Sequence, residues 1–163
     1  MTPTPSQLIV AFTGTRQGLT PAQTRTLDLL VGEFATLGRT LYPQLAHSVV
    51  GLHGMCQGGD ATFDRICKQH RVWTEGYPGK GWRGDSPWRD QNVKPDLVHL
   101  PELYLDRDHI MVDRCQWLIA GPDQEEYPRS GTWTTVRYAR KQDRYRGIIM
   151  PDGTTTWEKR AGG

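Results

Sequence analysis

An apolar run that begins at Val49 ends in a glycine-rich turn, with glycines at positions 54, 58 and 59 and Asp60 directly after them. Glycine has no Cβ, so the backbone there can adopt positive φ or let a ligand approach closely. Phe63 and Ile66 then begin an apolar pattern with the spacing of one helix face. The stretch predicts a strand, a turn and a helix whose unpaired N–H groups could hold an anion or a nucleotide. A tight turn without a ligand fits the same residues.

Composition limits what such a site could belong to. A chain of 163 residues fits one domain with a single core, and we predict one domain over residues 1–163. Lys plus Arg number 20 against 18 for Asp plus Glu, which gives a net charge of +2. So small a charge provides no strong field to recruit nucleic acid or an anionic membrane.

The cysteines and the N-terminus indicate the cellular compartment. Cys56, Cys67 and Cys115 form no C-x-x-C spacing, which argues against a zinc site and against a disulfide framework. No metal and no cofactor are therefore expected. The N-terminus lacks the basic and apolar regions of a leader peptide, and no apolar run approaches membrane-spanning length. We expect a cytoplasmic protein with reduced thiols and no membrane association.

Short apolar runs alternate with helical patterns along the chain. The first run, Leu8 to Phe12, is unbroken, as in a strand that is buried on both faces of a parallel sheet. Parallel neighbours need crossover connections, so the alternation predicts an α/β, Rossmann-like open parallel sheet of about five strands with helices on both faces. The five strands are expected at residues 8–12, 49–52, 72–77, 115–120 and 147–150.

A long segment between residues 78 and 103 has no sustained apolar period. Connections of this length inside a compact domain are commonly functional or disordered. Trp82 and Trp88 each stand beside an arginine, which favours a flap that stacks on a planar ligand over a surface loop. The polar tail, residues 151–163, is expected to be a short hairpin or a loose end.

Ligands of open α/β sheets bind beyond the carboxyl ends of the strands, where the strand order reverses. In the loops expected there, Arg16 could hold a phosphate or be a solvated charge. Asp60 could cap a helix or contact a sugar hydroxyl, and Arg107 could reach a phosphate or pair with Asp113. We predict that the ligand-binding residues are Gly14, Thr15, Arg16, Gly54, Met55, Gly58, Gly59, Asp60, Trp82, Arg107, Ser130, Gly131 and Thr132.

Three further features have structural explanations. His53 follows a buried strand and is expected to be a hydrogen-bonded structural histidine rather than an acid or base. Cys56 has no His or Asp partner nearby in the sequence, so no nucleophile is assigned to it. A basic run near the end of the last helix is expected to be solvated, and comprises Arg137, Arg140, Lys141, Arg144 and Arg146.

Taken in order, several short motifs resemble those of the SLOG superfamily. They are Thr13–Arg16, His53–Asp60, Arg107 with Met111 and Asp113, and Ser130–Thr132, within roughly residues 8–150. The superfamily includes the lonely-guy phosphoribohydrolases, the DNA-processing protein DprA, molybdenum cofactor carrier proteins, and small bacterial and phage proteins of the YspA type, which this sequence resembles most closely. The resemblance implies a Rossmann-like fold with a nucleotide or nucleotide-derived ligand, often in a homodimer.

Position 135 bears on the activity that this resemblance implies. The phosphoribohydrolases share a P-G-G-x-G-T-x-x-E signature whose glutamate serves the cleavage of the N-glycosidic bond. In this sequence Arg129 and Ser130 lie where the paired glycines would be, and Thr135 replaces the glutamate. Threonine has no carboxylate to activate water near neutral pH. The sequence therefore favours a sensor or sequestering module that binds its ligand without turnover.

Two other functions stay open. Single-stranded nucleic-acid binding fits the tryptophans of the flap, although the near-neutral charge disfavours it. A nucleoside 5′-monophosphate N-glycosidase would need a non-standard acid, so its catalytic residue is unknown. Candidates for that acid are Asp60, Asp108, Asp113, Glu125 and Glu126, and more broadly an acid of the flap or of the loop Asp123–Glu126.

Overall fold

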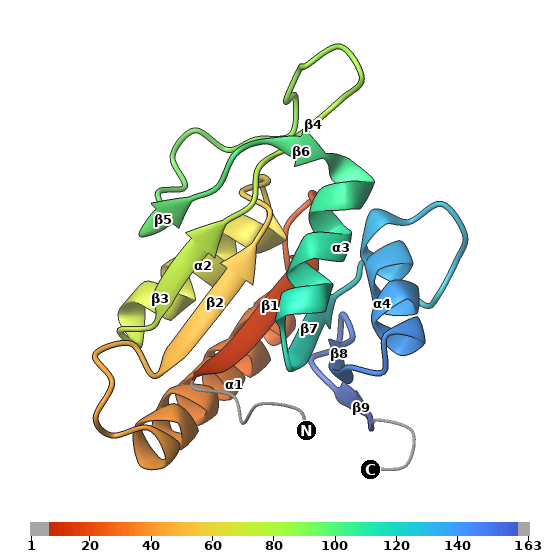
Figure 1. The fold of residues 1–163 in the computed structure, drawn as a ribbon. Coiled ribbons are helices and arrows are strands. Elements are labelled where there is room, and N and C mark those ends of the chain that lie inside the picture. Colours follow the sequence, from red (N-terminus) through yellow and green to blue (C-terminus); the bar gives the residue numbers. More distant parts are fainter. Residues whose placement is uncertain (1–6, 160–163) are drawn as a thin grey trace.

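The computed structural model of the protein describes residues 7–159, and the segment on which the leader-peptide prediction depends lies largely outside them. This part of the chain forms four helices and nine strands, with β3 to β6 following one another without a helix between them (Figure 1). In chain order they are β1 (Leu8–Gly14), α1 (Pro21–Leu41), β2 (Val49–His53), α2 (Gly59–Gln69), β3 (Trp73–Gly76), β4 (Gly79–Lys80), β5 (Leu97–Val98), β6 (Glu102–Leu103), α3 (Tyr104–Arg114), β7 (Trp117–Gly121), α4 (Gly131–Lys141), β8 (Tyr145–Ile149) and β9 (Thr155–Glu158).

The main sheet has seven strands in the order β5-β3-β2-β1-β7-β8-β9. All neighbours are parallel except β9, which pairs with β8 in antiparallel fashion. The predicted α/β class with a mostly parallel sheet is confirmed, but the predicted number of about five strands is wrong. The two additional strands are β5, only two residues long, and β9 in the polar tail, and neither carries the apolar run that marks a buried strand.

Helices cover both faces of the sheet, as Figure 1 shows. Side chains alternate along a strand, so Val10 and Phe12 of β1 face one core, with Phe63 of α2, while Ala11 faces the other core, with Val112 of α3. Phe12 and Phe63 stack with ring centroids 4.9 Å apart. The unbroken apolar character of β1 thus reflects burial against α1 and α2 on one side and α3 and α4 on the other.

The strand order reverses at β1. β2 and β3 extend the sheet on one side of β1, whereas β7 and β8 extend it on the other, and Gly14 lies in register with Gly121 at the carboxyl edge. The loops that leave β1 and β7 must therefore diverge toward opposite faces, which leaves a crevice between them. This is the edge at which the sequence predicts a ligand.

The flap (residues 78–103) contains ordered structure. β4 pairs with β6, and β5 pairs with the end of β3. Its middle crosses the glycine turn (residues 54–60), where the Gln57 N–H donates to the Trp88 carbonyl and the Asp90 N–H donates to the Met55 carbonyl, each at 2.9 Å. The flap is thus fixed to the turn by backbone hydrogen bonds.

None of the four described helices combines the length and the apolar character needed to cross a bilayer. The three cysteines are free thiols and all are buried.

Candidate functional site

A cavity of about 290 Å³ opens at the carboxyl ends of β1 and β7. Its walls come from the loop after β1, the glycine turn, α3 and the β7–α4 loop (residues 122–130). These segments are far apart in the sequence, and the reversal of strand order brings them to one edge. The predicted site residues that line this cavity are Gly14, Thr15, Arg16, Gly54, Asp60, Arg107, Ser130, Gly131 and Thr132.

Four predicted site residues lie outside the cavity lining. Trp82 is 92% exposed in the flap, and the tryptophan that lines the cavity is Trp88. Met55 is buried with a φ of 59°. Gly58 and Gly59 pack against the loop after β1, since the Gly59 N–H donates to the Thr15 carbonyl at 2.9 Å. These two glycines place two loops together and do not themselves face the cavity.

Most N–H donors of the glycine turn have acceptors within the protein. Asp60 Oδ2 accepts from the N–H groups of Gly54 and Cys56, both at 3.1 Å. The Met55 N–H donates to His53 Nδ1, and the Gln57 and Gly59 N–H groups donate to carbonyls of the flap and the first loop. Of the N–H groups that open α2, which the sequence predicts to be unpaired, that of Gly59 is paired, because the Thr15 carbonyl, distant in sequence, reaches it. Asp60 stabilises the turn rather than a free helix end.

Arg16 presents a cation to the cavity. Its guanidinium carbon lies 4.5 Å from the ring centroid of Trp88 and 5.5 Å from that of Tyr104. Such cation–π contacts hold the guanidinium in place while leaving its N–H donors available. Within residues 7–159, no carboxylate forms an ion pair with Arg16, although several other arginines do have such partners. The positive charge at this position is thus available to an anion.

Arg107 has a different role in the cavity wall. Its Nη1 donates to the carbonyls of Gly54 and Tyr77 at 2.8 and 2.9 Å, and its Nε donates to Asp108 Oδ1 at 2.6 Å. Of the two roles considered for Arg107, pairing with Asp113 is wrong, because Arg107 pairs with Asp108 and Asp113 accepts from the Tyr138 hydroxyl at 2.8 Å. Arg107 is buried and connects α3 to the glycine turn, so its charge is already compensated.

The N-terminus of α4 forms the opposite wall. Ser130 caps the helix by accepting from the Trp133 N–H at 3.2 Å. The N–H groups of Gly131 and Thr132 have no protein acceptor in the described part of the chain. Arg129, with a φ of 66°, precedes the cap and also lines the cavity. Free N–H donors, the positive end of the helix dipole and a guanidinium together favour an anion.

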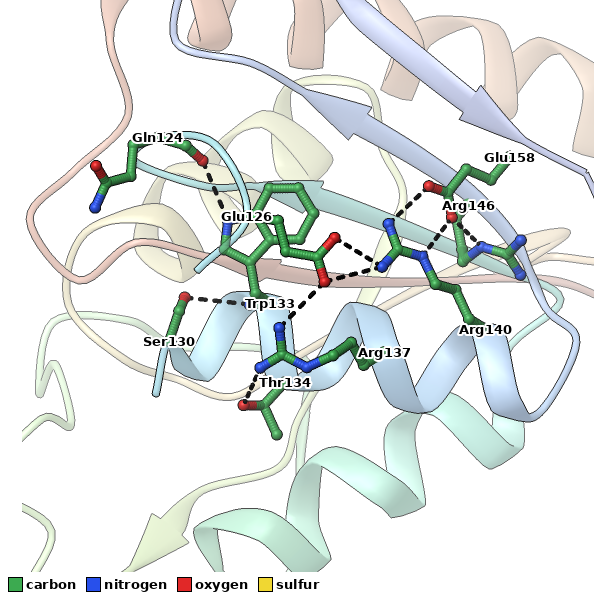
Figure 2. Close-up of polar contacts among 9 residues, drawn as sticks. All are labelled: Gln124, Glu126, Ser130, Trp133, Thr134, Arg137, Arg140, Arg146 and Glu158. Carbon is green, nitrogen blue, oxygen red and sulfur yellow. Dashed lines mark hydrogen bonds and ion pairs between the residues drawn. The ribbon is translucent and has the colours of Figure 1, made fainter. Parts of the chain in front are cut away.

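Ion pairs hold the β7–α4 loop against α4 (Figure 2). Glu126 accepts from Arg140 at 2.9 and 3.0 Å and from Arg137 at 3.2 Å, and the Trp133 indole N–H donates to the Gln124 carbonyl. Glu158 of β9 then bonds both Arg140 and Arg146. The prediction that this basic run is solvated is wrong for these three arginines. Their network fixes the loop that supplies Asp123, Tyr127 and Arg129 to the cavity.

His53, the last residue of β2, is structural, as its place beside a buried strand predicts. It is fully buried, its Nδ1 accepts from the Met55 N–H at 3.0 Å, and its Nε2 lies 2.8 Å from Asp64 Oδ1. Because Nδ1 is an acceptor, the ring proton belongs on Nε2, which donates to Asp64. Burial alone would raise the pKa of Asp64, but hydrogen bonds from His53 and Lys68 outweigh burial and lower it to about 2.

The low pKa of Asp64 predicts a loss of stability in acid. A carboxyl whose pKa is lower in the folded state than its ordinary value of 3.8 stabilises the fold above that value, and this contribution disappears as the pH falls toward about 2. We expect a loss of about 2 kcal/mol from this group. Urea titrations between pH 6 and pH 2 should show an Asp64→Asn variant less stable at pH 6 but less sensitive to acid. Parallel curves for the two proteins would contradict the assignment.

Cys56 lines the cavity but is a poor nucleophile. Burial, assisted by the Asp60 carboxylate, raises the pKa of its thiol to about 11. Burial also raises the pKa of Cys115 to about 12 and that of Cys67 well above its ordinary value. Near neutral pH we therefore expect an aromatic disulfide reagent to label the folded protein about 100-fold or more slowly than the protein denatured in guanidinium chloride. One thiol that reacts at the denatured rate would contradict the burial of the three cysteines.

Some cavity residues were not predicted from the sequence. Tyr127 and Arg129 belong to a polar loop with no pattern of its own, and Asp108 and Asp123 are predicted only as possible substitute acids. The position of the loop between the fourth predicted strand and its helix is the signal that could have located Tyr127 and Arg129. Among residues 7–159, no group of three or more His, Cys, Asp or Glu side chains has a geometry suited to a metal ion.

Comparison with known proteins finds solved structures with a similar fold. No protein-family model matches the sequence, and no curated protein matches it. Among solved structures, DNA processing protein A (DprA) from Streptococcus pneumoniae aligns with a TM-score of 0.63 and 18% identity, over 88% of this chain and 50% of the DprA chain. TM1055, a structural genomics target, aligns with a TM-score of 0.54 and 12% identity, over 85% of this chain and 71% of its own. This chain thus spans half the length of DprA, and at such identities the likeness shows the fold alone.

Proposed function

We propose that this protein binds a nucleotide or nucleotide-derived molecule in the cavity at the carboxyl edge of the sheet. The proposal rests on the guanidinium of Arg16, which has no ion-pair partner among the described residues. It lines the same cavity as the free N–H groups at the start of α4. A phosphate would have charged and neutral donors on both walls. Such an arrangement suits an anion that a protein binds reversibly.

The remaining lining suits the rest of a nucleotide. Trp88 and Tyr127 offer aromatic faces to a planar base, and Asp60, Asp108 and Asp123 offer acceptors for sugar hydroxyls. The cavity volume of about 290 Å³ is at the lower end of the range for small-molecule sites. These features support a mononucleotide, or a nucleotide-derived signal of similar size, as the ligand.

The absence of a glutamate at position 135 supports a sensor or sequestering module. We also propose, from the sequence resemblance, that the protein is a YspA-like member of the superfamily, acts in the cytoplasm and forms a homo-oligomer. Light scattering after gel filtration would test the oligomer, since a monomer mass at all concentrations would exclude it.

A second candidate function is cleavage of the N-glycosidic bond of a nucleoside 5′-monophosphate. The observation that favours it is the presence of the Asp108 carboxylate on the cavity wall. Asp113 and Glu126 are not suited to this role, because each is bonded to side chains outside the lining.

A thermal-shift screen tests the proposed binding. The panel contains mononucleotides, cyclic dinucleotides, ADP-ribose and its cyclic forms. A ligand at one hundred times its dissociation constant stabilises the folded state by about 2.7 kcal/mol, which corresponds to about 5 to 10 °C in a protein of this size. A panel in which no compound raises the melting temperature would overturn the proposal.

A further inference from the structure

A second cavity, of about 260 Å³, lies at the amino edge of the sheet, at the opposite ends of the parallel strands from the first cavity. Its walls come from the last turns of α1, the α1–β2 loop (residues 42–48) and the α2–β3 turn (residues 70–72). Figure 1 shows this loop and this turn at the ends of β2 and β3 that are far from the flap. The charged or titratable side chains that line the cavity are Arg39, His47 and Arg71.

Arg71 occupies a backbone position that favours glycine. The end of α2 forms a Schellman motif, in which the Val72 N–H donates to the Cys67 carbonyl at 2.8 Å and the Arg71 N–H donates to the Lys68 carbonyl at 3.1 Å. The motif places Arg71 in the left-handed region, with a φ of 58°, where a residue with a Cβ is strained. An arginine thus costs stability at this position, and such strain is typical of residues whose side chains have a function.

No carboxylate compensates the charges of the two arginines. Arg39 Nη2 donates to the His70 carbonyl at 2.8 Å, which holds the guanidinium at the edge of the cavity. Within residues 7–159, neither Arg39 nor Arg71 forms an ion pair, and the described residues that line the cavity include no Asp or Glu. Two guanidinium groups on one cavity favour an anion with two negative charges, and their planar donors match the oxygens of a phosphate group.

The rest of the lining limits the size and character of this anion. The His47 ring lies against Trp73 with ring centroids 4.4 Å apart, which fixes the imidazole beside the two cations. The cavity volume of about 260 Å³ is below the range of sites for drug-sized ligands, so the ligand is a small molecule. Apolar side chains form another part of the wall, and these are Ala35, Leu45, Val49 and Val72.

We propose that this cavity is a second ligand site, which binds a small phosphomonoester between the guanidinium groups of Arg39 and Arg71. The phosphate dianion accepts from both guanidinium groups, and its substituent lies against the apolar part of the wall. The inference does not depend on the proposed nucleotide site, because the two cavities share no lining residue and lie at opposite edges of the sheet.

The test uses phenyl phosphate as the probe, with inorganic phosphate beside it at the same ionic strength. Binding is followed through the backbone amide signals of isotope-labelled protein in solution NMR, which separates the two cavities. We expect saturable shifts of the amides around Arg39, His47 and Arg71, with tighter binding of phenyl phosphate than of inorganic phosphate. Shifts around Arg16 report any binding of the probe in the first cavity.

Arg71→Gly is the decisive variant, because it removes the guanidinium and the backbone strain together. We expect its melting temperature to rise by about 1 to 4 °C. Its dissociation constant for phenyl phosphate at the amino edge should rise by about 10-fold or more, while shifts around Arg16 stay as in the wild type. Arg65→Ala is the matched control for charge, since Arg65 is exposed on α2 outside this cavity. It should bind the probe like the wild type.

Several outcomes would overturn the proposal. Shifts that are absent, or confined to the first cavity, would show that no phosphomonoester binds at the amino edge. Unchanged affinity in Arg71→Gly would exclude the guanidinium as a ligand group. A lower melting temperature of Arg71→Gly would assign Arg71 a structural role instead. Equal affinity for inorganic phosphate would contradict the contact of the substituent with the apolar wall.

Discussion

Replacing Arg107 by methionine is expected to lower the free energy of unfolding by about 3 to 5 kcal/mol. The substitution leaves the half-buried Asp108 carboxylate without its cation and the Gly54 and Tyr77 carbonyls without their shared donor. Removing one partner of a buried ion pair costs more than the pair itself contributes, because the remaining charge stays desolvated. Denaturation in urea, monitored by fluorescence, measures the change.

The control for this experiment is Arg25→Met on α1. Arg25 is exposed, so its substitution should change stability by no more than about 0.5 kcal/mol. A loss below about 1 kcal/mol in Arg107→Met would show that water or a rearranged loop replaces the guanidinium. The wall between α3 and the glycine turn would then not depend on Arg107.

Replacing Gly58 by alanine is expected to cost about 3 kcal/mol or more. Gly58 has a φ of +81°, where residues with a Cβ are strained, and an added Cβ would lie 2.5 Å from the Arg16 carbonyl oxygen and 2.7 Å from that of Thr15. The strain alone costs about 1 to 2 kcal/mol, and separating the two loops adds to it. Because Arg16 would move with its loop, any ligand held by its guanidinium should also bind more weakly.

Gly84 provides a matched control for the conformational part of this cost. Its φ is +82°, but no atom lies within 4 Å of an added Cβ. Gly84→Ala should therefore lose only the strain, and the difference between the two variants measures the contact of the two loops. Equal losses in thermal unfolding would show that Gly58 is required for its φ alone.

The sequence predicts the central part of the fold well, because β1, β2, β7 and β8 are buried on both faces and must be apolar. The sequence does not predict β5 and β9, because they lie at the edges of the sheet. Their pairing depends on the adjacent strands β3 and β8 rather than on their own residues. The crevice between the loops after β1 and β7 follows from the strand order, which the structure gives and no local pattern in the sequence specifies.

The positions of site residues could be predicted where the course of the backbone fixes them. They could be predicted less well where a role depends on which group the side chain contacts. Arg16 and Ser130 follow from the positions of their loops. Asp113 is six residues from Arg107, about 9 Å along the helix, so the neighbouring Asp108 is the closer partner. The donors of the glycine turn are used by Thr15 and Trp88, which are distant in the sequence. No local sequence pattern indicates such contacts.

The central claim is that the cavity binds a nucleotide or nucleotide-derived anion through Arg16. Calorimetric titration of a ligand found in the thermal-shift screen into the wild type, Arg16→Ala and Arg65→Ala tests it most directly. Arg65 is exposed on α2 and does not line the cavity, so its variant controls for the loss of one positive charge.

A charge-assisted hydrogen bond contributes about 1.5 to 3 kcal/mol, so Arg16→Ala should raise the dissociation constant by about 10- to 150-fold. Arg65→Ala should bind like the wild type. If a folded Arg16→Ala protein binds the ligand with unchanged affinity, the ligand does not occupy this cavity in the manner proposed, and the account of the site is wrong.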